Sequence, residues 1–307
     1  MSPRWAARGG PRLPAAVIRP GIRLLGRRVL NPELSWDVQR HRLGQLAAAS
    51  PLPRGTTVAQ ATFGGVPADV LTAPGVSTAR TVVHFHGGGY CVGSPALAHA
   101  WAARLSDQAN CRVVLPDYRL APAHPYPAAL DDARAVLAAV RAQDGTGPVV
   151  LSGDSAGGGL ALALTLALRD ESGEPPAGCV LLSPWLDLAA DRRSDPGLVR
   201  RDALLSPRWL EACAAAYAAA GHWSEQLVSP LRADLAGLPP LLVQAGSEEL
   251  LAPDAQRLAA AASAAGTDVT YSLWPGLWHD FPLQAGLLAA ADSAVDQAAW
   301  FVRSVTA

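Results

Sequence analysis

The sequence predicts an α/β protein in which a mostly parallel β-sheet lies between two layers of helices. Short apolar runs of strand length alternate with longer amphipathic segments along most of the 307 residues, a rhythm typical of parallel strands joined by helical crossovers. Several runs are continuously apolar, such as Cys179–Leu182 and Leu241–Gln244, as expected for strands covered on both faces. Half of the residues are apolar, enough for one large core with or without a small cap.

The chain opens with the segment that departs most from this rhythm. We expect a loose start and then one or two helices, around Ile18–Leu30 and Ser35–Ala49, the second with Ser35 as its N-cap. Two alternating segments joined by Gly64-Gly65 then predict a β-hairpin. The expected strands are Thr56–Phe63, Val66–Thr72, Thr81–Phe85, Arg112–Leu115, Val149–Ser152, Cys179–Leu182, Leu241–Gln244 and Asp268–Leu273.

One interval, residues 185–238, contains no convincing strand. An insertion here follows the C-terminal end of a strand, so it would lie over a site at that edge of the sheet and form part of a cap. We therefore expect cap helices in residues 1–54, a catalytic domain in 55–307, and a cap insertion at 185–238. Beyond the first two, the expected helices are Ala96–Gln108, Ala128–Gln143, Ala156–Arg169, Pro207–Ala219, Asp254–Ala265 and Leu283–Val305.

Charge is unevenly distributed although the formal net charge is only -1. Residues 1–54 hold ten Arg and two acidic residues, whereas the rest of the chain is acidic. A basic start could touch an anionic membrane surface, but we favour solvated Arg side chains on amphipathic cap helices. We see no basic reader module for nucleic acid, no signal peptide, and no apolar run that would insert stably into a membrane.

Four cysteines are spread along the chain without CxxC spacing. In a chain of this size they predict free, mostly buried thiols and a reducing, cytoplasmic location. No metal site and no cofactor are indicated, and a homodimer is compatible with the sequence, which does not fix the oligomeric state. The cysteines are Cys91, Cys111, Cys179 and Cys213.

A candidate nucleophile lies in Gly153-Asp154-Ser155-Ala156-Gly157, between an apolar strand and an Ala/Leu-rich helix. This context predicts a sharp turn that lifts the Ser155 hydroxyl above the end of the sheet. The backbone N–H of Ala156 would then point to the place where an oxyanion forms. An incidental serine in a glycine-rich turn is the alternative, and the strand–turn–helix context favours the nucleophile.

A serine hydroxyl needs a base, and the base needs an acid to orient it. Downstream of Ser155 the only histidines are His222, in the cap insertion, and His279, in the loop after the last strand. The order serine, acid, histidine along this kind of fold selects His279 as the general base.

The acid should follow the strand Leu241–Gln244, where three carboxylates compete. Asp254 comes after Pro253 and is explained by a helix start. Glu248 and Glu249 both remain, because spacing from the strand does not decide between them.

A glycine run, His86-Gly87-Gly88-Gly89, follows the strand Thr81–Phe85. Glycines let the backbone approach a substrate without a Cβ in the way, so these N–H groups can complete an oxyanion hole opposite Ser155. We expect His86, Gly87 and Asp154 to support the site by shaping the loop and the turn rather than by transferring protons.

Four motifs occur in order and with fitting gaps: His86-Gly87-Gly88-Gly89, Asp117-Tyr118-Arg119-Leu120-Ala121-Pro122-x-x-Pro125-x-Pro127-Ala128-Ala129, Gly153-Asp154-Ser155-Ala156-Gly157-Gly158 and Gly276-x-x-His279-x-Phe281. From about Val58 to the C-terminus the chain thereby resembles the hormone-sensitive-lipase-like branch, bacterial family IV, of the α/β-hydrolases. The resemblance implies a serine carboxylesterase that acts on small, short-acyl esters and needs no cofactor. It also implies a triad with Ser155 and His279, and it gives Asp117-Tyr118-Arg119 a structural role. The implied oxyanion donors are the N–H groups of Gly88, Gly89 and Ala156.

The acid loop departs from the family pattern. Relatives usually have Asp followed by Pro-Leu, whereas the matching residue here is Glu249, followed by Leu250-Leu251. The chain resembles the subset that uses Glu, so Glu249 is the expected acid and Glu248 the second choice.

Two other functions share this scaffold. A non-catalytic small-molecule-binding protein is disfavoured because Ser155 and His279 are both present. Amide hydrolysis or acyl transfer uses the same triad, since the pocket and not the fold selects the acceptor.

Overall fold

The structure, a computed structural model, describes residues 12–48, 52–77, 79–143 and 147–307. Its centre is an eight-stranded sheet in the order β1-β2-β4-β3-β5-β6-β7-β8. The β1–β2 and β2–β4 pairs are antiparallel and the other pairs parallel, which confirms the expected fold class. The strands are β1 Thr57–Phe63, β2 Val66–Thr72, β3 Thr81–Phe85, β4 Arg112–Pro116, β5 Val149–Asp154, β6 Gly178–Leu182, β7 Leu241–Gly246 and β8 Val269–Trp274.

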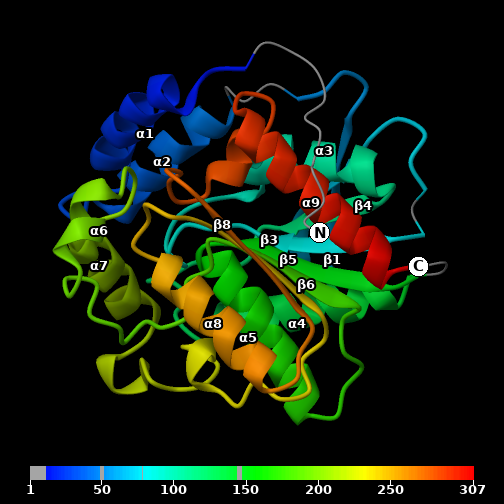
Figure 1. The fold of residues 1–307 in the computed structure, drawn as a ribbon. Coiled ribbons are helices and arrows are strands. Elements are labelled where there is room, and N and C mark those ends of the chain that lie inside the picture. Colours follow the sequence, from blue (N-terminus) through cyan, green and yellow to red (C-terminus); the bar gives the residue numbers. More distant parts are fainter. Residues whose placement is uncertain (1–11, 49–51, 78, 144–146) are drawn as a thin grey trace.

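Helices cover both faces of the sheet (Figure 1). One face carries α3 (His99–Ala109) and α9 (Ala289–Val305), and the other carries α4 (Ala128–Arg141), α5 (Ala156–Asp170) and α8 (Ala252–Ala264). A hydrophobic core lies on each face of the sheet. Successive strand residues pack into one core and then the other, because side chains alternate between the two faces along a strand. In β5, for example, Val150 packs with α3 and α9 while Leu151 packs with the opposite layer. The central strands β3, β5, β6 and β7 are therefore buried along their whole length.

The candidate site residues come from the C-terminal ends of these strands. The glycine run follows β3, Ser155 follows β5, the acid loop follows β7, and His279 lies in the loop after β8. Parallel strands end at one edge of a sheet, which is where open α/β sheets place their ligands.

A group of helices from two distant parts of the chain lies at one side of the sheet, at the left of Figure 1. They are α1 (Ala15–Val29), α2 (Trp36–Ala48), α6 (Pro196–Arg201) and α7 (Pro207–Tyr217). The indole N–H of Trp209 donates to Gln39 Oε1 at 2.8 Å, which joins α7 to α2. Ser35 Oγ accepts from the Val38 N–H at 3.4 Å, so Ser35 caps α2 as expected. The expected loose start falls on residues 1–11, and Ala49 ends the second expected helix; both lie outside the described residues.

The C-terminal helix is shorter than its sequence pattern predicts. Instead of one helix over Leu283–Val305, a 3₁₀ turn (η4, Phe281–Gln284) precedes α9, which begins at Ala289. Gly286 between them has φ +91°, a conformation that interrupts a right-handed helix. Its N–H donates to Asp292 Oδ1 at 2.6 Å, in the first turn of α9. The apolar periodicity continues across this break, which is why the prediction was wrong there.

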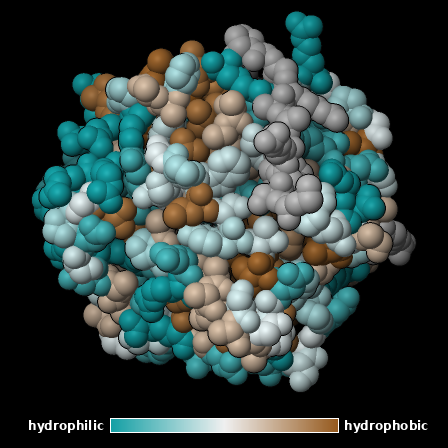
Figure 2. Space-filling view, viewed as in Figure 1, coloured by the Kyte–Doolittle hydropathy of each residue, from teal (hydrophilic) through white to brown (hydrophobic). Residues whose placement is uncertain are grey.

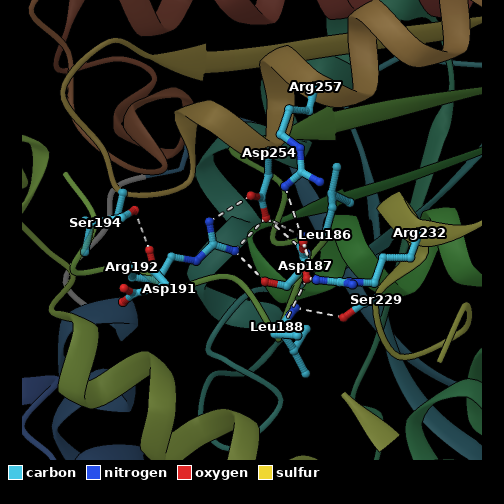
Figure 3. A network of polar contacts seen from close by, with 12 residues as sticks. Leu186, Asp187, Leu188, Asp191, Arg192, Ser194, Ser229, Arg232, Asp254 and Arg257 are labelled. Carbon is cyan, nitrogen blue, oxygen red and sulfur yellow. Dashed lines mark hydrogen bonds and ion pairs between the residues drawn. The ribbon is translucent and has the colours of Figure 1, made fainter. Parts of the chain in front are cut away.

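A buried ionic network fastens the segment after β6 to α8 (Figure 3). Asp254 lies in the first turn of α8 as expected, but its side chain is fully buried. Its Oδ2 accepts from the N–H groups of Leu186 and Asp187 at 2.9 and 3.1 Å, and Arg192 donates to its Oδ1 at 2.7 Å. The position of Asp254 in the first turn of a helix thus accounts for only a small part of the interactions that stabilise its buried carboxylate. Removing one partner of such a buried pair typically costs about 3–5 kcal/mol, so the network holds the start of the insertion in place.

Two further arginines complete the network. The carboxylate of Asp187, itself buried, accepts from Arg232 at 2.9 Å and from Arg257 at 3.3 Å. Arg257 belongs to α8 and Arg232 to the end of the insertion, so both ends of the insertion meet at one point.

None of the helices in the described ranges combines the length and apolar character needed to cross a membrane.

Candidate active site

Ser155 occupies a strained turn between β5 and α5. Its φ and ψ are 53° and -120°, a region that non-glycine residues rarely adopt and that clusters at functional sites. The two flanking glycines are required sterically. A Cβ on Gly153 would lie 2.2 Å from the backbone of Gly157, and a Cβ on Gly157 would lie 1.9 Å from the Phe85 carbonyl oxygen. The turn therefore has the form that the motif predicts.

The glycine run lies directly against this turn. The Gly87 N–H donates to Asp154 Oδ2 at 2.9 Å, and a Cβ on Gly87 would lie 2.3 Å from the same oxygen. Gly88 and Gly89 have φ values of +120° and +62°, which glycine adopts without strain. In the described part of the chain, no acceptor pairs with the N–H groups of Gly88, Gly89 or Ala156. Because buried N–H groups are nearly always paired, these three are available to a ligand oxygen.

Asp154 and His86 both contact the glycine run or its neighbouring strand. Asp154 Oδ1 lies 3.0 Å from His84 Nε2, so one carboxylate bridges β3 and the glycine run. The His86 ring stacks on Tyr118 with centroids 4.3 Å apart, and the Tyr118 hydroxyl donates to the His86 carbonyl oxygen at 2.7 Å. Burial lowers the pKa of His86, which favours the neutral ring and a structural role. Sequence reasoning missed His84, whose place inside a buried strand gave no indication of chemistry.

The two adjacent glutamates of the acid loop point to different places. Glu249 is fully buried, and its Oε2 lies 3.6 Å from His279 Nδ1. Burial raises the pKa of Glu249, while the hydrogen bonds and charge of its partners act in the opposite direction. Glu248 instead pairs with Arg19 of α1. The structure thus brings Glu249, and not Glu248, to the histidine.

Ser183, which sequence reasoning missed, links the acid to the histidine loop. Its hydroxyl donates to Glu249 Oε2 at 2.8 Å and accepts from the Asp280 N–H at 3.1 Å. It follows β6 directly, with φ +44°. A polar residue at the C-terminal end of a strand that lies between β5 and β7 was the available indication.

His279 is buried between two carboxylates. Its Nδ1 faces Glu249, and its Nε2 lies 3.1 Å from Asp280 Oδ2. Among the described residues no hydrogen bond joins Ser155 Oγ to His279, so Nε2 has to turn from Asp280 toward the hydroxyl to act on it. Catalytic hydrogen bonds are often long or poorly aligned before substrate binds. Asp280 is the third residue of the site, after His84 and Ser183, that sequence reasoning missed.

The pKa values of this pair are strongly perturbed. Burial is the largest influence on His279 and lowers its pKa, but Asp280 and Glu249 together raise the pKa well above its ordinary value. Burial raises the pKa of Asp280 to about 7, with Asp154 and Glu249 adding to the effect. Burial has the larger effect on the carboxylate of Asp202 and raises its pKa, while the charge of His279 also acts on that carboxylate and lowers its pKa. A carboxylate at Asp280 therefore favours the imidazolium, which cannot accept a proton.

Replacing Asp280 with asparagine should lower the pKa of His279. The neutral, basic imidazole then persists to lower pH, so the acidic limb of the kcat/KM profile should move down by at least about one pH unit. Ester hydrolysis measured from pH 4 to pH 9, a range of about five units around the histidine pKa, gives the limb. The exposed Asp268→Asn variant is the control and should keep the wild-type limb. An unchanged acidic limb in Asp280→Asn would show that the Asp280 carboxylate does not raise the pKa of His279.

An apolar chamber of about 330 Å³ adjoins the polar groups. Gly87, Gly88, Asp154, His279 and Asp280 line its polar part. No tryptophan is among its lining residues in the described structure; Trp185, Trp209 and Trp278 are buried in the packing. Its apolar walls include Ile22, Leu25 and Val29 of α1, Leu43 and Leu46 of α2, and Leu204, Leu283 and Leu287.

The arrangement suits acyl transfer to and from a serine hydroxyl. A strained serine, free N–H groups and a buried imidazole–carboxylate pair lie beside an apolar chamber. In the described ranges, no group of three or more His, Cys, Asp or Glu side chains is placed to hold a metal ion.

Comparison with known proteins gives a consistent result. A family model described as the alpha/beta hydrolase fold matches residues 82–283. An acetyl-hydrolase of Streptomyces hygroscopicus is 39% identical over 261 residues, which cover 81% of this chain and 87% of that protein. The crystal structure of a hormone-sensitive lipase from a metagenome library superposes with a TM-score of 0.90 at 32% identity, covering 97% of this chain and 100% of that one.

A second solved structure extends the match. An esterase from the bacterial hormone-sensitive lipase family aligns with a TM-score of 0.89 at 31% identity, covering 96% of this chain and 100% of that one. The two structural matches cover 97% and 96% of this chain. The chain therefore belongs to the α/β-hydrolase fold family and, within it, to the bacterial hormone-sensitive-lipase-like esterases.

Proposed function

We propose that this protein hydrolyses small carboxylic esters with short acyl groups, through a triad of Ser155, His279 and Glu249. The observation that carries the proposal is the strained Ser155 beside three free backbone N–H groups. Similarity to esterases and an acetyl-hydrolase supports the reaction class. The short-acyl preference is supported by the size of the chamber, at the lower end of the about 300–1,000 Å³ typical of ligand pockets.

In the proposed mechanism, Ser155 Oγ attacks the ester carbonyl carbon while His279 Nε2 takes the hydroxyl proton. Glu249 keeps the proton of the imidazole on Nδ1 and stabilises the imidazolium. The N–H groups of Gly88, Gly89 and Ala156 receive the oxyanion. His279 then protonates the leaving alcohol, and a water molecule activated by the same imidazole hydrolyses the acyl-serine.

We also propose that residues 1–54 and the insertion 185–238 together form a cap on the catalytic domain 55–307. The apolar walls that α1, α2 and Leu204 contribute to the chamber support this division. The free, buried cysteines are compatible with the cytoplasmic location that the sequence predicts. That location, and a homodimer, stay predictions.

A series of p-nitrophenyl esters from acetate to laurate tests the proposal. We expect kcat/KM to be highest for acyl groups no longer than hexanoate and to fall steadily beyond, because a longer chain exceeds the chamber. The matched p-nitroanilides should be hydrolysed far more slowly, which separates an esterase from an amidase. A maximum at laurate would contradict the short-acyl preference, and faster anilide cleavage would contradict the reaction class.

A further inference from the structure

The outer side of α1 combines exposed apolar side chains with arginines. Leu24 follows Val17 by seven residues and Arg28 follows Leu24 by four, so the three side chains share one side of the helix. Val17 is 60% exposed and Leu24 51% exposed. Arg27 and Arg28 flank Leu24 from the last turn. Figure 2 shows hydrophobic and hydrophilic residues intermixed over the region that α1 occupies in Figure 1.

Apolar exposure is concentrated here rather than spread evenly. The described residues expose ten large hydrophobic side chains, and five belong to this one area. Leu13 lies two residues before the first residue of α1, and its N–H donates to the Leu287 carbonyl oxygen at 2.9 Å, so the η4–α9 loop lies next to the start of α1. We call these side chains the α1 surface: Leu13, Val17, Leu24, Leu25 and Leu287.

The opposite side of α1 is fixed to the protein. A Cβ on Gly26 would lie 2.8 Å from the Leu204 carbonyl oxygen, so the two backbones are in close contact. Arg23 donates to the carbonyl oxygens of Arg200 and Arg201 at 3.0 and 3.1 Å. The α1 surface therefore faces outward on a helix that is already folded and held.

Arg27 and Arg28 place positive charge beside the α1 surface. Helix α1 contains four arginines and no acidic residue, and in the described structure neither Arg27 nor Arg28 has an acidic partner. On the opposite side of α1, a surface recess of about 470 Å³ is lined by Arg19, Arg23, Arg200 and Arg201, with Glu248 as its one acidic residue, so the helix as a whole is basic. Leucine and valine side chains bordered by arginines are typical of helices that lie in the interface of an anionic bilayer.

The α1 surface also borders the candidate active site. Leu25 and Leu287 are both exposed and both line the apolar chamber that reaches His279. A lipid surface against α1 would therefore lie at the chamber mouth.

We propose that the α1 surface docks this protein on an anionic lipid surface, as a peripheral contact without membrane insertion. Sequence alone favours solvated arginines here; the exposed leucines and valine, and their continuity with the chamber, change that interpretation. Docking itself does not depend on the proposed esterase chemistry. Its consequence for catalysis, delivery of amphiphilic esters directly to the chamber mouth, rests on the proposed function.

Vesicle flotation of the full chain tests the docking. Binding to phosphatidylcholine vesicles that contain phosphatidylglycerol should exceed binding to pure phosphatidylcholine by at least about tenfold at low salt, and should decrease with added salt. Arg27→Gln with Arg28→Gln should reduce binding to the anionic vesicles about tenfold. Val17→Gln with Leu24→Gln should reduce it by a similar factor, through the apolar contribution.

Matched controls separate docking from general charge, hydrophobicity and folding. Arg54→Gln and Val58→Gln change an exposed arginine and an exposed valine elsewhere and should bind like wild type. The four α1 substitutions lie outside the chamber walls, so these variants should keep the wild-type unfolding temperature and hydrolysis of water-soluble esters. Ser155→Ala should bind vesicles normally, which distinguishes failure of docking from failure of the proposed catalysis.

Three results would overturn the proposal. The first is equal binding of the wild type to anionic and neutral vesicles, or no binding to either. The second is wild-type binding by both α1 double variants. The third is a wild-type protein that is a dimer and does not bind vesicles, and that becomes a monomer in the variant Val17→Gln with Leu24→Gln. In that case a second copy of the chain would cover the α1 surface.

Discussion

Replacing Ser155 with alanine should lower kcat for a short p-nitrophenyl ester by about a million-fold, to the level left when a serine nucleophile is removed from a complete triad. Without the hydroxyl no acyl-serine forms, and the remaining imidazole and N–H groups assist only direct attack by water. KM should change little, because the chamber walls and the oxyanion donors stay in place. Steady-state and single-turnover kinetics on purified protein measure both quantities.

Two further measurements make the Ser155 result specific. A serine-directed phosphonate should label wild-type protein at one residue, with the added mass on the peptide that contains Ser155, and should leave Ser155→Ala unlabelled. Ser304→Ala, which removes a hydroxyl from the C-terminal helix α9, should react and turn over like wild type. Label on another residue, or full activity in Ser155→Ala, would refute the nucleophile.

The positions of the strands were largely predictable from sequence because short apolar runs bounded by turn residues mark where each strand begins and ends. Each expected strand overlaps the observed one, and the ends differ by two residues at most. Ser155 was predictable for a different reason: only glycine fits at Gly153 and Gly157, so the steric demand of the turn is visible in the residue types. The chain order then restricted the base to His279.

Features that depend on distant contacts were not predictable in this way. The six-residue helix α6 is too short for a periodic pattern, although Asp195 caps it through the Leu198 N–H at 3.0 Å. The choice between Glu248 and Glu249 depends on Arg19, more than 200 residues earlier in the chain. Asp280 becomes part of the site because its φ of +55° turns its carboxylate toward His279 Nε2. None of these contacts leaves a trace in local composition.

The paired substitutions Glu249→Gln and Glu248→Gln should have very different effects on turnover. Glu249→Gln should lower kcat by about 10³–10⁴, as loss of the charge behind a catalytic histidine does elsewhere. The glutamine amide can donate to His279 Nδ1 and select the tautomer whose proton blocks Nε2. Glu248→Gln should stay within about threefold of wild type, because the partly exposed pair with Arg19 contributes little.

The pH profile of the residual activity adds a test that a merely structural role would not pass. The Glu249 carboxylate is one of the groups that raise the pKa of His279. Its removal should therefore shift the acidic limb of kcat to lower pH while the rate on the plateau falls. Glu249→Asp, which keeps the charge and shortens the reach, should recover part of kcat. If Glu248→Gln alone abolishes turnover, the acid is Glu248. In that case the Glu248 carboxylate must leave Arg19 to reach the histidine, and this ion pair would have to break before catalysis.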